Sequence, residues 1–250
     1  MRSNIPLDSL AQECSQLIEG AQRIAALTGA GISTNAGVPD FRGPQGLYVT
    51  RRYDPDTIFD IGYFGQNPKP FFDFARDFVS MEEKLEPTFT HRFLPRLEAQ
   101  GKLKGVITQN IDSLHRKAGS KNVLEMHGSF LKSFCQDCRR EFSYPEMHTK
   151  LFQEDVPRCR CGGVIKPDIV FFGENVKCLA ESYALARNSD LFFVIGTSCV
   201  VYPAAMMPEV VEGSIVVVNK DPVSIRSSRI ILQVQEDIDR FFELLQRKIA

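Results

Sequence analysis

The sequence has no excess of charge of either sign: 30 lysines and arginines face 31 aspartates and glutamates, a formal net charge of -1 over 250 residues. This balance removes the electrostatic basis for a nucleic-acid partner or an anionic membrane. The chain also lacks an apolar run of the roughly 18 residues that a membrane span needs, and its start, "MRSNIPLDSLAQEC", lacks the apolar segment of a secretion signal. We therefore expect a soluble, cytoplasmic protein with no direct nucleic-acid or membrane binding.

Apolar residues make up 43% of the chain, which is enough for one sizeable core or a large domain that carries a smaller one. Short apolar runs with polar or glycine-rich ends recur in it: "RIAALTGAG", "KGVITQN", "SDLFFVIGTS" and "GSIVVVNKD". Buried strands of this kind, separated by helix-like segments, predict an α/β fold with a doubly wound parallel sheet. Ligands of such sheets gather at the carboxyl ends of the strands.

Helices are predicted before and between these strands. Residues 8–22 carry apolar side chains at helical spacing, and so do "NPKPFFDFARDFV" and "THRFLPRLEAQG". The last two lie in residues 43–100, which we expect to form a loop and a helical insertion. Residues 128–167 are too polar for a core of their own and need another source of stability.

That source is a cluster of cysteines. Cys135 and Cys138 have two residues between them, Cys159 and Cys161 have one, and the pairs are twenty residues apart. Four thiolates on short loops predict a closed, structural zinc site, with no open position for catalysis. Two disulfides or unpaired thiols are the alternatives, and both are disfavoured without a secretion signal. The remaining cysteines (Cys14, Cys178 and Cys199) lie in apolar stretches, which predicts burial.

The stretch "LTGAGISTNAGVPDFRG" follows the first predicted strand. Its glycines, Gly29, Gly31 and Gly37, do not fit the usual dinucleotide fingerprint, so a plain turn is as good an interpretation as a phosphate cradle. Asp40, Phe41 and Arg42 come next. Their carboxylate, aromatic ring and guanidinium could contact the sugar and the ring of a bound ligand.

Polar residues also follow the second strand, where Gln109, Asn110 and Asp112 could bind an amide or a ribose, although polar strand ends are common. His127 lies in "LEMHGSF", between a predicted strand end and the cysteine segment. An imidazole there suits a general base near neutral pH, or a structural hydrogen bond. The other three histidines, His91, His115 and His148, are in helix-like or loop contexts and are expected to be structural.

Taken together, these pieces resemble the sirtuin family of NAD-dependent protein deacylases. The matching stretches, in the family's order, are "GAGISTNAGVPDFRG", "TQNIDSLHRKAG", "HG", the four cysteines, "KPDIVFFGE", "GTS" with "YPAA", and "VVNKD". The resemblance implies a Rossmann-like NAD-binding domain (1–42, 101–127 and 168–250), a cofactor loop with the helical insertion (43–100) and a small zinc-binding module (128–167).

The resemblance also implies the site residues. The NAD pocket would be formed by Gly29, Ala30, Gly31, Ile32, Asp40, Phe41, Arg42, Gln109, Asn110, Asp112, Gly196, Thr197, Ser198 and Asn219. The acyl-lysine tunnel and the backbone clamp for the peptide would be formed by Val170, Phe171, Phe172 and Gly173, in a run expected to be extended. His127, with Asn110, would be catalytic, and the four cysteines would bind one structural zinc ion.

In the family's reaction an acyl-lysine attacks NAD, nicotinamide leaves, and the histidine acts as base on a ribose hydroxyl that takes the acyl group. The products implied are nicotinamide, free lysine and 2′-O-acyl-ADP-ribose, and the partners are acetyl-lysine proteins or peptides. Ala75 and Phe78 replace the Tyr-x-x-Arg of desuccinylating members, so acidic acyl groups should be poor substrates. Ser113 replaces a usual glycine. NAD hydrolysis, ADP-ribosyl transfer and a non-catalytic peptide-binding module are the alternatives.

Overall fold

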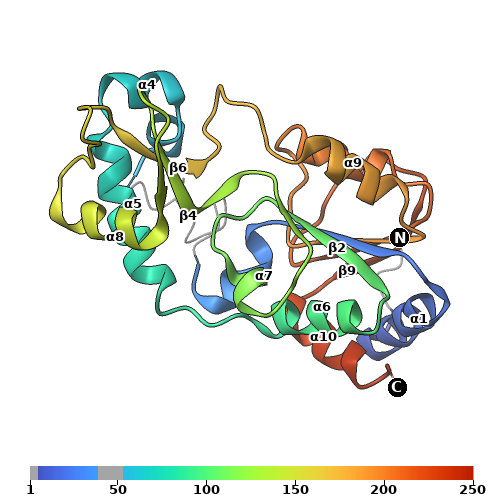
Figure 1. The fold of residues 1–250 in the computed structure, drawn as a ribbon. Coiled ribbons are helices and arrows are strands. Elements are labelled where there is room, and N and C mark those ends of the chain that lie inside the picture. Colours follow the sequence, from blue (N-terminus) through green and yellow to red (C-terminus); the bar gives the residue numbers. More distant parts are fainter. Residues whose placement is uncertain (1–4, 39–52, 250) are drawn as a thin grey trace.

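The computed structural model describes residues 5–38 and 53–249, so Asp40, Phe41 and Arg42 lie outside the described residues. Two lobes are visible, a larger one around a six-stranded sheet and a smaller one around a three-stranded sheet (Figure 1). The strand order of the larger sheet is β3-β2-β1-β7-β8-β9, and every pairing in it is parallel. The expected α/β fold with a doubly wound parallel sheet is confirmed.

All four predicted strands are present: β1 (Ile24–Thr28), β2 (Leu103–Thr108), β7 (Leu191–Ile195) and β8 (Ser214–Asn219). β1 and β7 are buried throughout, as expected of central strands covered on both faces. Two edge strands escaped prediction, β3 (Val123–Glu125) and β9 (Ile230–Gln235). β3 has only three residues, and β9 alternates between buried and exposed side chains, so neither forms a continuous apolar run.

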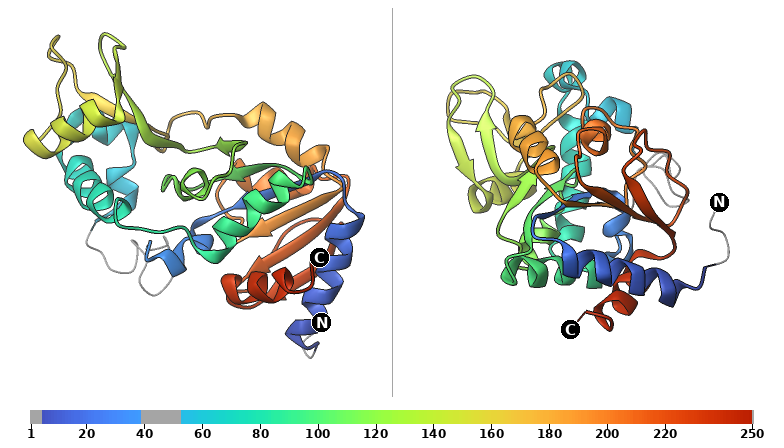
Figure 2. Two further views of the ribbon diagram at one scale, coloured as in Figure 1. Left: turned by 60° about the horizontal axis from the view of Figure 1, so that its bottom comes forward. Right: turned by 90° about the vertical axis from the view of Figure 1, so that its right-hand side faces the viewer.

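Helices cover both faces of this sheet (Figure 2). One face packs on α1 (Leu7–Gly20), α6 (Phe89–Ala99) and α10 (Ile238–Gln246), which share a single apolar cluster with it. The other face packs on α9 (Leu179–Arg187) and the 3₁₀ segment η3 (Ala204–Glu209). The predicted helices at residues 8–22 and in "THRFLPRLEAQG" correspond to α1 and α6.

The order of the strands reverses beside β1. The chain builds β2 and β3 on one side of β1 and then returns to place β7 on the other, with Thr28 of β1 level with Ile195 of β7. The connections that follow the two strands at such a reversal run to opposite faces of the sheet, which opens a crevice at the carboxyl ends of the strands. The glycine loop and the "GTS" loop both start at this point.

The smaller lobe combines two segments that are distant in sequence. One carries α3 (Pro55–Ile58), α4 (Ile61–Gln66) and α5 (Lys69–Glu82); the other carries β4 (Gly128–Cys135), β5 (Glu141–Ser143), α8 (Tyr144–Gln153) and β6 (Ile165–Ile169). They share one apolar cluster, in which Phe78 of α5 stacks on Phe130 of β4 with ring centres 5.3 Å apart. Residues 128–167 therefore share their apolar core with the helical insertion of residues 43–100.

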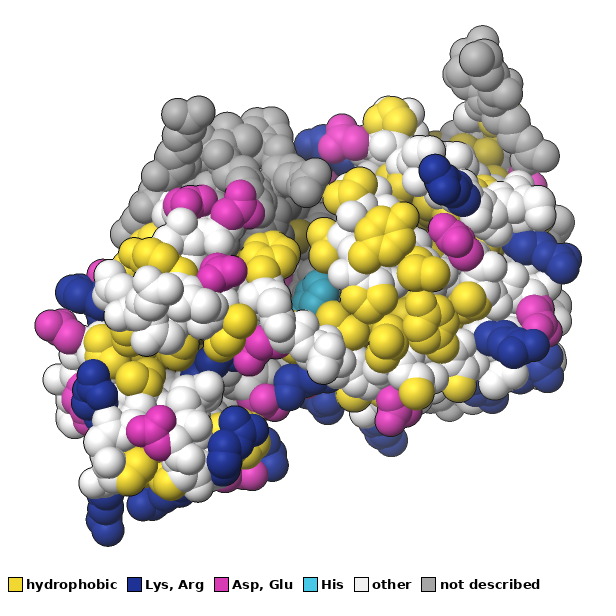
Figure 3. All heavy atoms as spheres, turned by 90° about the horizontal axis from the view of Figure 1, so that it is seen from above, with side chains coloured by type: hydrophobic (Ala, Val, Ile, Leu, Met, Phe, Trp, Pro, Cys, Tyr) yellow, Lys and Arg dark blue, Asp and Glu magenta, His cyan; other side chains and the backbone are white. Residues whose placement is uncertain are grey.

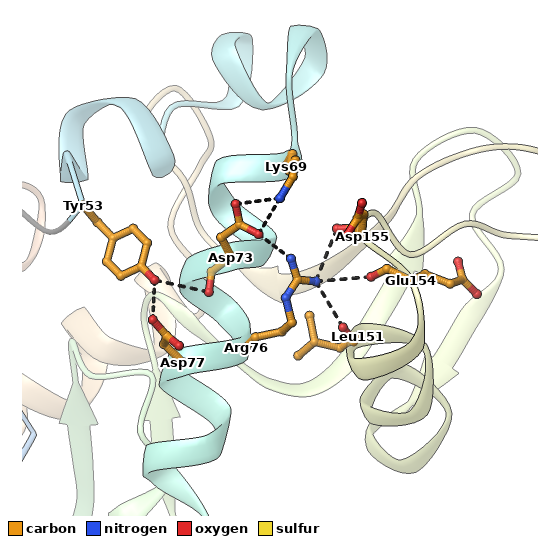
Figure 4. Close-up of polar contacts among 8 residues, drawn as sticks. All are labelled: Tyr53, Lys69, Asp73, Arg76, Asp77, Leu151, Glu154 and Asp155. Carbon is orange, nitrogen blue, oxygen red and sulfur yellow. Dashed lines mark hydrogen bonds and ion pairs between the residues drawn. The ribbon is translucent and has the colours of Figure 1, made fainter.

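Arg76 joins the same two segments (Figure 4). From α5 its guanidinium donates to the backbone oxygens of Leu151, Glu154 and Asp155, at 3.1, 3.2 and 3.3 Å, and it also pairs with Asp73. These oxygens lie at and beyond the last turn of α8, where carbonyls have no partner within the helix and the helix dipole favours a cation. Arg76 of α5 thus caps the C-terminal end of α8.

None of the helices formed by residues 5–38 and 53–249 combines the length and the apolar character needed to cross a bilayer.

Candidate active site

The glycine loop packs directly against the loop that follows β7. The Gly31 N–H donates to the Gly196 oxygen at 2.8 Å, and the Gly29 N–H donates to the Ile195 oxygen at 3.1 Å. A Cβ atom on Gly31 would lie 2.8 Å from the Gly196 Cα, and one on Gly196, whose φ is +62°, would lie 2.4 Å from the Ile32 nitrogen. Only glycine permits this backbone contact. The loop is thus more than a plain turn, since it closes one wall of the crevice.

The remaining residues predicted for this wall differ in accessibility. Ala30 is partly buried, whereas Ile32 is 2% exposed and packs in the core of the larger lobe, so only its backbone can face a ligand. Ser198 is exposed, and Asn219 is partly buried at the end of β8, where its amide donates to the Asp221 oxygen at 2.8 Å. These two residues lie at the carboxyl ends of neighbouring strands.

Gln109 links the ends of three elements. Its backbone N–H donates to the Thr28 oxygen at 3.0 Å, and its side-chain amide donates to the Thr197 hydroxyl at 3.0 Å. The loops after β1, β2 and β7 are thereby joined at the carboxyl edge of the sheet. Two of the residues predicted from separate motifs, Gln109 and Thr197, are in direct contact.

Asn110 and Asp112 meet at Ser33, a residue that the prediction did not include. The Ser33 hydroxyl donates to Asp112 Oδ2 at 2.6 Å, and the Asn110 amide donates to the Ser33 oxygen and to the Gly29 oxygen, both at 3.1 Å. Asp112 is 4% exposed, and burial raises its pKa, while the hydrogen bonds from Ser33 and the Leu114 N–H oppose that rise. Ser33 lies inside the quoted glycine stretch, which was the available signal.

His127 is held in one tautomer. Its Nδ1 lies 2.7 Å from the backbone oxygen of Gln109. Because a carbonyl oxygen only accepts, Nδ1 carries the proton and Nε2 keeps its lone pair. Burial lowers the pKa of His127, and the hydrogen bond to Gln109 partly opposes this. The ring is therefore neutral near pH 7, as a general base requires.

The backbone around His127 explains the "HG" pair. Gly128 has φ +70°, and a Cβ atom there would lie 1.8 Å from the Asp168 oxygen, so no other residue fits. The carbonyl of His127 accepts from the Val170 N–H at 2.9 Å, which places the segment after β6 beside the histidine. Figure 3 shows a histidine in the hollow between the two lobes, next to apolar side chains.

Residues 169–173, expected to be extended, are only partly so. β6 ends at Ile169, Phe172 forms an isolated bridge to Asp60, and Gly173 turns with φ +92°. Val170 is partly buried and Phe172 is 51% exposed, whereas Phe171 is 1% exposed and packs in the core of the smaller lobe. Phe171 thus supports this segment from below.

The four clustered cysteines come together from the end of β4 with the turn after it and from the loop before β6. Their sulfur atoms all lie within 4.8 Å of one another, with 3.5 Å between Cys135 and Cys161 and 3.7 Å between Cys138 and Cys159. Zinc–sulfur bonds of about 2.3 Å give an edge of about 3.8 Å in a tetrahedral site. The set therefore fits one zinc ion with four thiolate ligands.

The other cysteines differ from the prediction in part. Cys14 is buried, but Cys178 is exposed and Cys199 is partly buried. Both of these have positive φ, 50° at the start of α9 and 52° after the "GTS" loop. The turn at Cys178 brings its side chain to the surface, whereas Cys199 still packs against the apolar cluster that α9 and η3 share with the sheet.

The other histidines are structural, as expected. His91 and His115 are buried with ring centres 4.7 Å apart, each with one ring nitrogen 2.9 Å from a threonine hydroxyl, Thr88 and Thr28 respectively. His148 lies on α8, 3.0 Å from a Glu83 carboxylate oxygen.

Comparisons with known proteins show the family to which the chain is similar. The family model described as "Sir2 family" matches residues 29–203. An NAD-dependent protein deacetylase of Sulfolobus acidocaldarius is 41% identical over 213 residues, 84% of this chain and 83% of the relative. One from Thermotoga maritima is 41% identical over 214 residues, 83% and 86% of the two chains.

Solved structures give the same result. A Sir2 complex with a p53 peptide and NAD+ has a TM-score of 0.86 at 36% identity, covering 94% of this chain and 97% of that one. A Sir2 variant with a deacetylated p53 peptide and 3′-O-acetyl ADP ribose has a TM-score of 0.88 at 36% identity, covering 96% and 99%.

Proposed function

The chain belongs to the Sir2 family and is an NAD-dependent protein-lysine deacetylase, and we propose that His127 is the general base of its reaction. One observation carries this assignment: the Nδ1 proton of His127 is held by the Gln109 oxygen at 2.7 Å, so that Nε2 can accept a proton. Asn110, which follows Gln109 in the loop after β2, is the second residue of the proposed catalytic centre. Its amide is fixed by Gly29 and Ser33, so the carbonyl end of the side chain has a defined position.

The NAD pocket follows the crevice from the glycine loop to the end of β8. We assign its walls to the residues predicted from the sequence: Gly29, Ala30, Gly31, Ile32, Asp40, Phe41, Arg42, Gln109, Asn110, Asp112, Gly196, Thr197, Ser198 and Asn219. Backbone contact between Gly31 and Gly196 supports a surface without side chains, which suits the close approach of phosphates. When bound, NAD supplies the ribose that takes the acyl group, with release of nicotinamide.

The substrate is an acyl-lysine protein or peptide, bound by Val170, Phe172 and Gly173 with Phe171 as support. An apolar passage accepts a neutral acyl-lysine at little cost, whereas a lysine ammonium would lose its hydration there. Ala75 and Phe78 are buried in the core of the smaller lobe, and the nearby cation, Arg76, is bonded to α8. This arrangement supports a preference for acetyl over acidic acyl groups.

We divide the chain into an NAD-binding domain (1–42, 101–127 and 168–250), a cofactor loop with helical insertion (43–100) and a zinc-binding module (128–167). Zinc is structural there, because all four ligands come from cysteine and no position stays open for water. A cytoplasmic location is supported by the four clustered thiols, which an oxidising compartment would tend to pair.

The test combines two readouts on an acetyl-lysine peptide with and without NAD, namely peptide mass and free nicotinamide. We expect matched, NAD-dependent loss of acetyl and release of nicotinamide. His127→Ala should lower kcat by about a hundredfold or more, with NAD affinity retained, because only the base is lost. His148→Ala, which changes a histidine on α8, is the matched control and should retain wild-type turnover.

Two results would contradict the proposal. Nicotinamide release with the acetyl group untouched would favour an NAD hydrolase or an ADP-ribosyltransferase. Unchanged deacetylation in the His127→Ala variant would remove His127 from its role as base.

A further inference from the structure

A lysine is buried beneath the substrate segment. Lys166 of β6 is 5% exposed, and its ammonium donates to the Ile169 oxygen at 2.6 Å and to Glu174 Oε2 at 2.8 Å. It also lies 4.0 Å from the centre of the Phe171 ring. A buried ammonium loses hydration, which lowers the pKa of Lys166, and the Glu174 carboxylate opposes that loss. The Lys166 ammonium thus contacts a carbonyl oxygen, a carboxylate and an aromatic ring.

Glu174 uses the same oxygen to close a turn. Its Oε2 accepts from the Phe171 N–H at 2.8 Å, and its own N–H donates to the Phe171 oxygen at 3.0 Å. Lys166 fixes the beginning of the segment through Ile169, and Glu174 fixes its end. One ion pair thus bonds to the backbone at both ends of residues 169–174.

This path also connects the two lobes. The Val170 N–H donates to the His127 oxygen at 2.9 Å, while Phe172 donates to the Phe59 oxygen at 2.7 Å and accepts from the Ile61 N–H at 3.1 Å. These bonds occupy the N–H and C=O of Phe172, and the bonds to Glu174 occupy those of Phe171. Within residues 5–38 and 53–249, the N–H and C=O of Gly173 have no hydrogen-bond partner, so they are available to an extended peptide.

We propose that Lys166 and Glu174 are positioning residues for the acyl-lysine peptide, which they do not touch. By fixing residues 169–174 they present Gly173 and the exposed ring of Phe172 to the peptide in a set position beside His127. The inference rests on the proposed role of residues 170–173 in substrate binding. The Lys166–Glu174 ion pair adds a polar support to a segment that was predicted from its apolar residues alone.

The test measures binding and turnover separately. Binding of a fluorescently labelled acetyl-lysine peptide is followed by anisotropy, and steady-state kinetics give KM for the peptide, KM for NAD, and kcat. Glu174→Ala should raise the peptide Kd and KM about tenfold, with kcat at saturating peptide and KM for NAD within about threefold, because a displaced segment binds peptide poorly but leaves the base and the cofactor pocket intact. Glu174→Gln keeps the shape and one acceptor, so the rise should be smaller, about threefold.

Lys132→Met is the matched control. Lys132 pairs with Glu141 at 2.8 Å in the same three-stranded sheet, but both side chains are more than half exposed, at 58% and 51%. Its peptide Kd should equal that of the wild type.

The possible results distinguish the positioning role of Lys166 and Glu174 from the proposed function. Wild-type peptide Kd in folded Glu174→Ala and Glu174→Gln variants would overturn the positioning role, as would parallel losses in peptide binding, NAD binding and melting temperature. A wild-type enzyme that binds the peptide without turnover would refute the proposed function, while the Kd series still decides this inference.

Discussion

Ser113 and Glu82 form a contact that a glycine at position 113 would not permit. Ser113 has φ 52°, a left-handed conformation that costs a non-glycine residue about 1 kcal/mol. Its hydroxyl lies close enough to the Glu82 carboxylate, at the end of α5, to lower the pKa of that group. Burial and the nearby charge of Asp112 raise the pKa of Glu82 to about 7, against an ordinary value of 4.5, while Ser113 and Lys117 oppose the rise.

Glu82→Gln should therefore stabilise the protein above neutral pH. Between pH 4.5 and 7 the unfolded chain releases the Glu82 proton and the folded protein keeps it, so the wild type loses stability across this window and the loss is complete above pH 7. We expect a gain on the order of 1–3 kcal/mol at pH 8 that shrinks toward pH 5. Urea unfolding at several pH values measures it.

Glu86→Gln is the control for that series, because the Glu86 side chain is 82% exposed and lies 3.8 Å from the Lys117 ammonium. It should change stability little at either pH. An equal gain from Glu82→Gln at pH 5 and pH 8 would contradict the assigned titration.

The sequence motifs indicated residues that carry chemistry themselves, but they did not indicate the residues that hold those side chains in position. The four cysteines were predicted because their residue type and spacing carry the chemistry directly, whereas the role proposed for His127 came from the family resemblance. Ser33, Lys166 and Glu174 were missed, although all three lie in quoted motifs. Their roles depend on partners such as Asp112 or Phe171 that become neighbours only through the fold, and spacing along the chain does not contain that information.

The contact between α5 and α8 depends on Arg76. Its side chain is 23% exposed and donates to three carbonyl oxygens at the end of α8, which would otherwise need water or another cap. Arg76→Met retains much of the apolar stem and removes these bonds. We expect a loss of about 1–3 kcal/mol in the free energy of unfolding, measured by chemical denaturation.

Arg187→Met provides the comparison. Arg187 pairs with Glu212, and both side chains are about two-thirds exposed, at 68% and 66%, so the expected loss is about 0.5 kcal/mol or less. Similar losses in the two variants would show that the α8 cap contributes no more than a surface ion pair.

Regular elements were predictable where one pattern dominated. Buried strands gave continuous apolar runs, and α1, α5 and α6 gave helical spacing. Residues 169–173 were misjudged in part because their apolar composition fits both an extended strand and a supported turn. The turn is set by Gly173 and by contacts with residues 59–61, which come from another part of the chain.

The zinc site and the helical insertion depend on each other through the shared core of the smaller lobe. Composition indicated that residues 128–167 needed external support, but only the fold identifies α5 as its second source. Loss of the metal should therefore affect more than the two cysteine loops.

Zinc chelation, or the Cys138→Ser substitution, should raise hydrogen exchange in β4, β6, α8 and α5 and abolish deacetylation, while β1, β7 and β8 stay protected. Exchange followed by mass spectrometry locates the change. Cys178→Ser, which alters an exposed cysteine outside the cluster, should leave exchange in the smaller lobe unchanged. An effect confined to the two cysteine loops would show that the shared core does not need the metal.

The position of β1 between β2 and β7 has a consequence for biosynthesis. β1 ends at Thr28, but its neighbour β7 begins at Leu191. At about 5–20 residues per second, a ribosome needs on the order of 10–30 s to make the chain between them. Until then one side of a largely apolar central strand has no partner, and an open strand edge invites pairing with other chains. The nascent chain thus stays vulnerable to aggregation until β7 has left the ribosome, and chaperone demand should be greatest in that interval.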